Sequence, residues 1–280
     1  MNRQFQLVDV FGDESFTGNA LAVIADGSDL DTETMQAITR WFNLSETTFL
    51  LPPTETAADY RVRIFTLERE LPFAGHPTLG TCHAWLKAGG QPKRGDRIVQ
   101  QCGAGLIPLR RSQQGLAFAA PPVIRDGPID DAKLDEIVGL LGIARDDIVE
   151  ARWADNGPGW AAVLLASADA VLAVEPARAH PRRIDVGIIG PYPPGSDIAF
   201  ELRTFFSDPH GGIVEDPVTG SFNASAAQWM LASGRAQSPY VASQGTRLGR
   251  RGRIAIDQDG EGALWIGGAT ETLFSGEASF

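Results

Sequence analysis

The fold is decided by the stretch Glu70-Leu-Pro-Phe-Ala-Gly-His-Pro-Thr-Leu-Gly80. Pro77 suits the first turn of a helix, because an amide there has no intrahelical partner to lose. Apolar residues then recur at near-helical spacing until Gly89-Gly90 ends the pattern. The spacing predicts a helix with Gly75 and His76 at its amino end, where unpaired N–H groups and the helix dipole favour an anion. A plain turn followed by a helix would also account for this segment.

A related segment recurs half a chain further on. Residues 215–221 read Glu-Asp-Pro-Val-Thr-Gly-Ser, and small and apolar residues follow at helical spacing until Gly234. The pattern Pro77-x-x-Gly-Thr81 lies 140 residues before Pro217-x-x-Gly-Ser221, and 140 is half of the 280 residues. This offset predicts two related halves, each pointing a helix amino end at a shared site.

The composition indicates a folded globular protein. A chain of 280 residues, 43% of them hydrophobic, can build one large domain or two of ordinary size. The formal net charge of −11 disfavours nucleic acid and anionic membranes as partners, although one site can still bind a small anion. Cys82 and Cys102 are too few for a disulfide framework, and the first residues lack the apolar core of a secretion signal. No apolar run approaches the roughly 18 residues of a membrane span, so we expect a cytoplasmic protein.

Short alternating and apolar runs predict a strand-rich chain with few helices. Residues 60–65 and 200–206 alternate in the same way, and each run leads into one of the two glycine-bearing segments. Amphipathic helices are predicted at 31–42 and 130–141. The rigid, polar segment from Pro121 to Pro128 is the predicted crossover between the halves. We therefore expect domains at 1–120, completed by a strand at about 268–280, and at 121–267.

Glu46 is the first candidate for chemistry. It lies in Ser45-Glu-Thr-Thr48 between the apolar residues Leu44 and Phe49. Apolar neighbours remove hydration from a carboxyl group and disfavour its charged form, which suits a general base that can return the proton. The alternative is a solvated surface glutamate at a helix–strand junction.

The two glycine-bearing segments supply the other candidates. His76 can hold or relay a proton near neutral pH, or it can cap the following helix. Asp216 can pair with His76 or bind an amino group, or it can serve the helix dipole as an N-terminal carboxylate. Ser221 and the backbone amides of Gly75 and Gly220 can hold a substrate carboxylate.

Other site classes lack their sequence patterns. The histidines show no His-Glu-x-x-His spacing and the cysteines are not paired, so no metal site is predicted. No Gly-x-Gly-x-x-Gly follows a strand, and no Walker lysine motif or Gly-x-Ser-x-Gly elbow is present.

Taken together, the motifs resemble the PhzF-like family, named for the isomerase of phenazine biosynthesis and related in fold to diaminopimelate epimerase. The matching segments run in family order: Val8-Asp-Val-Phe with Gly18-Asn19, Asn43-Leu-Ser-Glu-Thr-Thr-Phe, Arg63-Ile-Phe-Thr, Pro72-Phe-Ala-Gly-His-Pro-Thr, Glu215-Asp-Pro-Val-Thr-Gly-Ser and Ser243-Gln-Gly. The resemblance implies an α+β fold with two pseudo-symmetric halves, each a curved mixed β-sheet wrapped around a central helix. It also implies an active site in the cleft between the halves, a homodimer and no cofactor.

Roles carry over residue by residue within this resemblance. Glu46 resembles the family's proton-shuttling glutamate, and His76 with Asp216 resembles its assisting polar pair. The substrate contacts implied by the resemblance are Asn19, Gly75, Gly220 and Ser221. Two positions depart from the family pattern: Ala20 follows Asn19, and Phe222-Asn223 follows Ser221. A bulky Phe222 near the cleft would change the size of the substrate pocket.

The sequence thus predicts a cofactor-independent isomerase that moves a proton on a small carboxylate-bearing substrate, cyclic or amino-acid-like. A lyase or dehydratase that uses the same glutamate is one alternative. A non-catalytic protein that binds a small carboxylate is another. A racemase with two opposed thiols is disfavoured, because Cys82 has Phe222 at its matched position in the second half.

Overall fold

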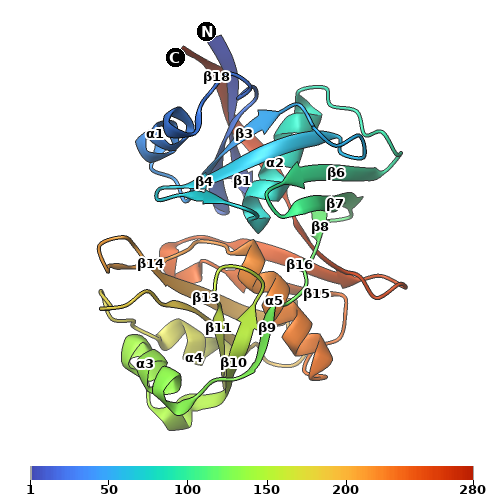
Figure 1. Cartoon of the computed structure of the whole chain (residues 1–280). Coiled ribbons are helices and arrows are strands. Elements are labelled where there is room, and N and C mark those ends of the chain that lie inside the picture. The colour runs from blue at the N-terminus through green and yellow to red at the C-terminus, as the bar shows by residue number, and fades with distance from the viewer. Residues whose placement is uncertain (1, 280) are drawn as a thin grey trace. The chain divides into compact units, whose positions relative to one another are not determined.

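The computed structural model describes residues 2–279 (Figure 1). The chain divides into two compact units: unit 1 comprises residues 1–119 and 267–280, and unit 2 comprises residues 120–266. Residues 1 and 280, which the predicted domains include, lie outside the described residues. Each unit is a mixed β-sheet with a central helix, so the predicted α+β class is confirmed.

The sheet of unit 1 follows one path of strand pairing. Its strands pair in the order β18 (Thr270–Ser279), β1 (Asn2–Val10), β2 (Asn19–Ile24), β3 (Glu46–Leu51), β4 (Tyr60–Thr66), β6 (Arg97–Cys102), β7 (Gly105–Ser112) and β8 (Gly115–Ala119). The short β5 (Glu70–Leu71) also pairs with β4. Only β2–β3 and β4–β6 are parallel among these pairs, and parallel neighbours need a crossover. The crossovers carry α1 (Thr32–Phe42) and α2 (Gly75–Lys87).

Helix α2 is the central helix of unit 1. Every residue from Gly75 to Cys82 is buried, and the helix contacts β1, β2, β3, β8 and β18. Gly80 allows this close packing, because a Cβ there would lie 2.6 Å from Leu21 Cδ2 and 2.9 Å from Val10 Cγ2. The buried hydroxyl of Thr81 donates a 2.8 Å hydrogen bond to Thr48 Oγ1 on β3. The sheet therefore wraps around a helix that has almost no solvent-facing side along its first two turns.

Unit 2 follows the same path. Its strands pair in the order β9 (Arg125–Pro128), β10 (Ile148–Asp155), β11 (Ala161–Leu165), β12 (Asp185–Pro191), β13 (Phe200–Ser207), β15 (Tyr240–Gln244) and β16 (Gly252–Gln258). The parallel pairs are β11–β12 and β13–β15, and their crossovers carry α4 (Ala168–Ala173) and α5 (Gly220–Ala232). The remaining elements are β14 (Ile213–Glu215), which pairs with β13, α3 (Asp131–Leu141) and the 3₁₀ turns Arg145–Asp147 and Thr246–Leu248. Strand β17 (Leu264–Gly268) begins in unit 2 and ends in unit 1.

The two units repeat one topology. Along each path the pairings run antiparallel, antiparallel, parallel, antiparallel, parallel, antiparallel, and each of the two parallel crossovers contains a helix. The prediction of two pseudo-symmetric halves is therefore confirmed. Within the predicted crossover 121–128, the last four residues form β9.

The predicted 140-residue offset is wrong for the central helices. Helices α2 and α5 each have 13 residues and begin at Gly75 and Gly220, which are 145 positions apart. Pro77 lies in the first turn of α2, whereas Pro217 precedes α5. The offset of 140 does hold in β4 and β13. Phe65 on β4 pairs with Glu70, and Phe205, which lies 140 positions after Phe65, makes the matching pair with Glu215. The hairpin between Phe205 and Glu215 is five residues longer than the one between Phe65 and Glu70, so the offset is 145 from there on.

Phe222 fills the core of unit 2. It is 0% exposed, and its ring packs against Trp160 with the centroids 5.6 Å apart. A Cβ on Gly187 of β12 would lie 2.1 Å from the Phe222 ring, so this glycine makes room for the aromatic side chain. Phe222 is therefore a core residue whose bulk is accommodated by Gly187, and its ring is not exposed to a substrate.

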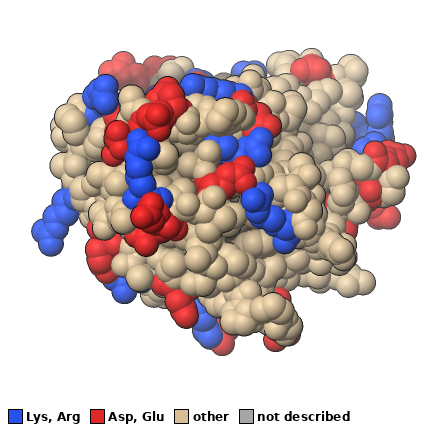
Figure 2. All heavy atoms as spheres, turned by 90° about the horizontal axis from the view of Figure 1, so that it is seen from below, with Lys and Arg blue, Asp and Glu red and all other residues tan. Residues whose placement is uncertain are grey.

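Charged side chains of unit 2 pair with one another at its surface. The guanidinium of Arg152 lies 2.6 Å from Asp126, and that of Arg235 lies 2.7 Å from Glu150. Figure 2 shows basic and acidic side chains next to one another on one face of the molecule. Between residues 2 and 279, no helix combines the length and the apolar character that crossing a membrane requires.

Candidate active site

Glu46 and His76 lie together in unit 1. Glu46 is the first residue of β3, where it pairs with Leu21 on β2 and Thr66 on β4. His76 is the second residue of α2 and is 3% exposed. The side chain of Glu46 is 15% exposed, and its Oε2 lies 3.5 Å from His76 Nε2. The strand end and the helix end thus place a carboxyl group against an imidazole ring.

Asn19 fixes the orientation of the His76 ring. With its amide nitrogen facing the ring, Asn19 Nδ2 lies 3.3 Å from His76 Nδ1. An amide NH₂ group only donates, so Nδ1 accepts and the proton of a neutral ring sits on Nε2, which faces Glu46. Burial lowers the pKa of His76 from 6.5 to about 3, so the ring is neutral at ordinary pH. The predicted role of His76 in holding or relaying a proton stays a prediction.

Asp9 and Gly18 explain why the motif around Asn19 has its sequence. Asp9 Oδ2 accepts a 3.1 Å hydrogen bond from the backbone N–H of Thr17. A Cβ on Gly18 would lie 2.4 Å from Asp9 Oδ1 and 2.2 Å from the carbonyl oxygen of Val10, so only glycine fits there. The loop is thereby folded tightly around the Asp9 carboxylate, and β2 begins at Asn19 opposite Val10.

The amino ends of α2 and α5 differ from those of the other long helices. The side chains of Asp31 and Asp130 cap α1 and α3 by accepting backbone hydrogen bonds. The cap residues of α2 and α5, Ala74 and Thr219, make no such side-chain bond, and neither helix has an acidic residue in its first turn. Two helix ends are therefore left with backbone donors that a bound anion can use.

Asp216 precedes α5 and does not belong to its first turn, because the helix begins four residues later at Gly220. The hydroxyl of Thr219 donates a 2.5 Å hydrogen bond to Asp216 Oδ2. The backbone N–H of Asp216 donates to the carbonyl oxygen of Thr204 on β13 at 3.2 Å. The carboxylate thus lies on a tightly bonded segment between β14 and α5.

Ser221, the second residue of α5, is held by two donors. The indole Nε1 of Trp160 donates to Ser221 Oγ at 3.0 Å, and Asn156 Nδ2 donates to the Ser221 carbonyl oxygen at 2.8 Å. An indole N–H only donates, so Ser221 Oγ accepts from it and keeps its own hydrogen for another acceptor. This arrangement suits a serine that donates to a ligand carboxylate.

The predicted site residues therefore form two groups. Asn19, Glu46, Gly75 and His76 lie in unit 1, and Asp216, Gly220 and Ser221 lie in unit 2. The sequence interpretation missed the residues that support the second group: Trp160, Thr204, Thr219 and Gln244. Gln244 does fall within the family-like Ser243-Gln-Gly segment, which is the one signal that pointed toward it.

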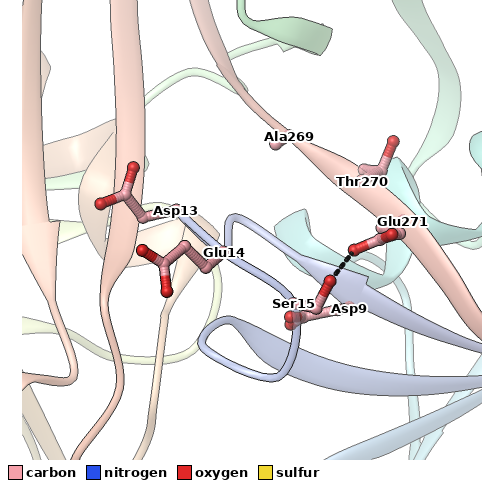
Figure 3. A pocket seen from close by; sticks show the side chains of 8 residues that line it. Asp9, Asp13, Glu14, Ser15, Ala269, Thr270 and Glu271 are labelled. Carbon is pink, nitrogen blue, oxygen red and sulfur yellow. Dashed lines mark hydrogen bonds between the residues drawn. The ribbon is translucent and has the colours of Figure 1, made fainter.

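A separate pocket of about 260 Å³ lies within unit 1 (Figure 3). Its lining includes Asp9, Asp13, Glu14 and Glu271, and Ser15 Oγ donates to Glu271 Oε2 at 2.6 Å. Four carboxylates disfavour an anionic ligand. Across residues 2–279, no cluster of three His, Cys, Asp or Glu side chains has a geometry that could hold a metal ion. This pocket therefore does not fit the predicted carboxylate site.

Cys82 is embedded in α2. It is 0% exposed, and burial raises the pKa of its thiol to about 12. With the offset of 145, its counterpart in α5 is Ala227, not Phe222. Neither offset places a second thiol opposite Cys82, so a two-thiol racemase has no support in these residues.

Comparison with known proteins identifies the family. A family model described as phenazine biosynthesis-like protein, PhzC-PhzF, matches residues 8–276. The chain belongs to this family. It is 32% identical to antisense-enhancing sequence 1 of Schizosaccharomyces pombe, over 98% of each chain. It is also 32% identical to trans-2,3-dihydro-3-hydroxyanthranilate isomerase of Pseudomonas aeruginosa, over 92% of this chain and 91% of that protein.

The fold agrees with a solved structure of the same kind. A predicted epimerase from Pseudomonas aeruginosa superimposes with a TM-score of 0.80 at 27% identity, over 99% of each chain. Relatives in this PhzC-PhzF family are named isomerases, and the chain is an isomerase by this relationship.

Proposed function

We propose that this isomerase moves a proton on a small carboxylate-bearing substrate without a cofactor, with Glu46 as the general acid and base. The observation that carries the proposal is the contact between Glu46 and the neutral ring of His76, which Asn19 orients. We further propose that the two helix ends, one from each unit, serve a single site in the cleft between the units. The uncapped amino ends of α2 and α5 support this part of the proposal.

The proton transfer needs one group that accepts and then donates. Glu46 removes a proton from carbon, so the C–H bond breaks and its electron pair enters the conjugated system of the substrate. The protonated carboxyl group of Glu46 exchanges its hydrogen with solvent, and Glu46 then donates a proton to another carbon, which restores the enzyme. His76 Nε2 lies 3.5 Å from Glu46 Oε2, and in the substrate complex we expect its N–H to donate to the ionised carboxylate and orient it without adding a positive charge.

The substrate carboxylate binds where donors are already arranged. The backbone amides of Gly75 and Gly220 and the hydroxyl of Ser221 are the proposed donors, and Asn19 contacts the substrate beside His76. Asp216 accepts from an amino or hydroxyl group of the substrate. Oriented donors of this kind stabilise the negative charge that develops during proton removal, by roughly 3–4 kcal/mol per well-aimed donor.

The first substrate to test is trans-2,3-dihydro-3-hydroxyanthranilate, because three relatives at 31–32% identity are named as isomerases of this compound. Its carboxylate and amino group match the donors and the acceptor of the proposed site. Small cyclic amino and carboxylic acids form the rest of a test panel.

The experiment follows the panel by proton NMR in deuterium oxide, with binding measured by thermal shift. The wild-type protein should place solvent deuterium on a carbon of an isomerised product. Glu46→Gln should keep binding and lose turnover by about 10²–10⁴-fold, because it removes the acid–base group. Glu68→Gln, an exposed glutamate on the same unit, is the matched control and should retain full activity.

Other outcomes select other functions. A product that has lost a leaving group would indicate a lyase. Binding without deuterium incorporation in any panel compound, by the wild type as well as by Glu46→Gln, would indicate a binding protein and contradict the proposal.

A further inference from the structure

Gln244 lies at the centre of a buried hydrogen-bond network in unit 2. It is 0% exposed, and its Oε1 accepts from the backbone N–H of Thr219 at 3.0 Å and from Asn223 Nδ2 at 2.8 Å. A backbone N–H can only donate, so this contact fixes which end of the Gln244 amide is the oxygen. The amide nitrogen must therefore face the opposite side.

The nitrogen of Gln244 supplies hydrogens to the segment that carries Asp216. Nε2 lies 3.0 Å from Thr219 Oγ1, 3.1 Å from Thr204 Oγ1 and 3.1 Å from the Asp216 carbonyl oxygen. An amide nitrogen carries two hydrogens, so the three acceptor oxygens share these two hydrogens. Gln244 thus joins β15 to the segment between β14 and α5.

The direction of every hydrogen follows from the chemistry of the acceptors. An ionised carboxylate only accepts, so the single hydroxyl hydrogen of Thr219 points to Asp216 Oδ2, 2.5 Å away. Thr204 Oγ1 lies 2.6 Å from Thr219 Oγ1 and must then donate to it. Gln244 and Thr204 both donate toward Thr219, and Thr219 donates to Asp216.

Unit 1 has the same scaffold without this connection. Gln100, also 0% exposed, follows α2 as Gln244 follows α5, and it bonds to Tyr60 and Thr78. In place of Thr219 and Asp216, unit 1 has Ala74 and Leu71, which carry neither a hydroxyl nor a carboxylate. Each unit thus has a buried glutamine on the strand that follows its central helix, and within residues 2–279 the chain of donors to a carboxylate is found in unit 2.

We propose that Gln244, Thr204 and Thr219 are positioning residues that hold the Asp216 carboxylate in a single orientation for a donor group of the substrate. This inference rests on the proposed function, in which Asp216 accepts from an amino or hydroxyl group. Positioning matters here because Asp216 lies outside any helix or strand, and a displacement of about 1 Å at a substrate contact can cost about 10²-fold in rate.

The first variants change only the Thr219 hydroxyl. Thr219→Val keeps the shape of the side chain and should lower kcat/KM by about 10–100-fold. Thr219→Ser restores the hydroxyl and should return activity to within about threefold of the wild type. Ser225→Ala, on the same helix, removes another buried hydroxyl, which donates to the Phe222 carbonyl oxygen at 3.2 Å, and should leave kcat/KM unchanged.

A second variant reverses the network without changing its size. In Gln244→Glu an oxygen replaces the donating nitrogen and attracts hydroxyl hydrogens. Thr219 then turns its hydrogen from Asp216 toward residue 244, and Thr204 turns its hydrogen from Thr219 toward residue 244. Activity should fall as in Thr219→Val. The double variant should be no worse than the poorer single variant, because both changes remove the same contact.

Crystal structures of the substrate-free proteins separate this inference from the proposed function. The Asp216 carboxylate should shift or take two conformers in Thr219→Val and Gln244→Glu, and stay in place in Thr219→Ser and Ser225→Ala. If the wild type converts no panel compound, the proposed function fails, and the crystal structures still test the positioning. An unmoved Asp216 in Thr219→Val, or wild-type kinetics in that variant of an active enzyme, would overturn the inference.

Discussion

The segments that lead into α2 and α5 share one pattern and differ in their chemistry. Residues 70–75 read Glu-Leu-Pro-Phe-Ala-Gly, and residues 215–220 read Glu-Asp-Pro-Val-Thr-Gly. The glutamate, the proline and the glycine recur in register. The positions between them, and the residue after the glycine, carry the differences: Leu71 against Asp216, Ala74 against Thr219 and His76 against Ser221.

The repeated residues hold the framework. Arg63 makes two hydrogen bonds to Glu70, and Arg203 makes two to Glu215. Each guanidinium also lies 5.0 Å from the ring of the phenylalanine two residues further along the strand. The framework thus fixes where each helix starts, and the exchanged positions assign proton handling to unit 1 and ligand holding to unit 2 in the proposed function.

Replacing the framework arginine should have very different effects in the two units. The Arg203 side chain is 3% exposed and also donates to the carbonyl oxygens of Val171 and Val174, at 3.0 and 2.6 Å. Arg203→Met should cost about 3–5 kcal/mol, because Glu215, only 13% exposed, is left as a charge without its main partner. Arg63 is 17% exposed beside a 39% exposed Glu70, so Arg63→Met should cost about 1 kcal/mol or less.

Urea unfolding followed by circular dichroism measures both losses of free energy. Equal losses for Arg63→Met and Arg203→Met would show that burial does not distinguish the two pairs. In that case the framework would be equally strong in both units.

The second prediction concerns His76, which occupies in α2 the position that Ser221 occupies in α5. Its folded pKa of about 3 lies below the ordinary value of 6.5, so below pH 6.5 the unfolded chain binds a proton that the folded ring does not. His76 therefore lowers stability as the pH falls from 6.5 toward 3, by up to about 1.4 kcal/mol per pH unit. At pH 5 this amounts to about 2 kcal/mol, which His76→Asn should remove.

The measurement compares the free energy of unfolding at pH 7 and pH 5 for the wild type and the variant. His210→Asn, at an exposed histidine, is the control and should leave the pH dependence unchanged. The same pH dependence in His76→Asn and in the wild type would show that the ring is not held neutral.

Local sequence patterns were sufficient for most of the fold. The helices predicted at 31–42 and 130–141 appear as α1 and α3 within one residue, because each has an aspartate cap and an apolar stripe. The elements that the prediction omitted include α4 and the strands β10, β12 and β15. Helix α4 has only six residues, and β12 contains two glycines that local propensity does not favour in a strand.

The supporting residues of the site required tertiary information. The family motifs named Glu46, His76 and Asp216, and their proposed roles stay predictions. Gly187 is explained only by the Phe222 ring that packs on it, 35 residues further along the chain. The 140-residue offset matched a proline in α2 to a proline before α5, because the sequence does not reveal the longer turn between β13 and β14.

The prediction with the smallest expected effect concerns Ser221, whose hydroxyl accepts a hydrogen bond from Trp160, and it assumes the proposed function. Trp160→Phe removes the N–H that donates to Ser221 Oγ and keeps an aromatic ring against Phe222. The hydroxyl would then lose its fixed orientation, a loss worth about 1 kcal/mol. KM for the carboxylate substrate should rise about fivefold, with kcat within about twofold of the wild type.

Trp229→Phe is the matched control. Its indole is on α5 and is 5% exposed, and its Nε1 makes no hydrogen bond to any residue between 2 and 279. A similar rise in KM for both variants would mean that lost packing, and not the orientation of Ser221, weakens binding.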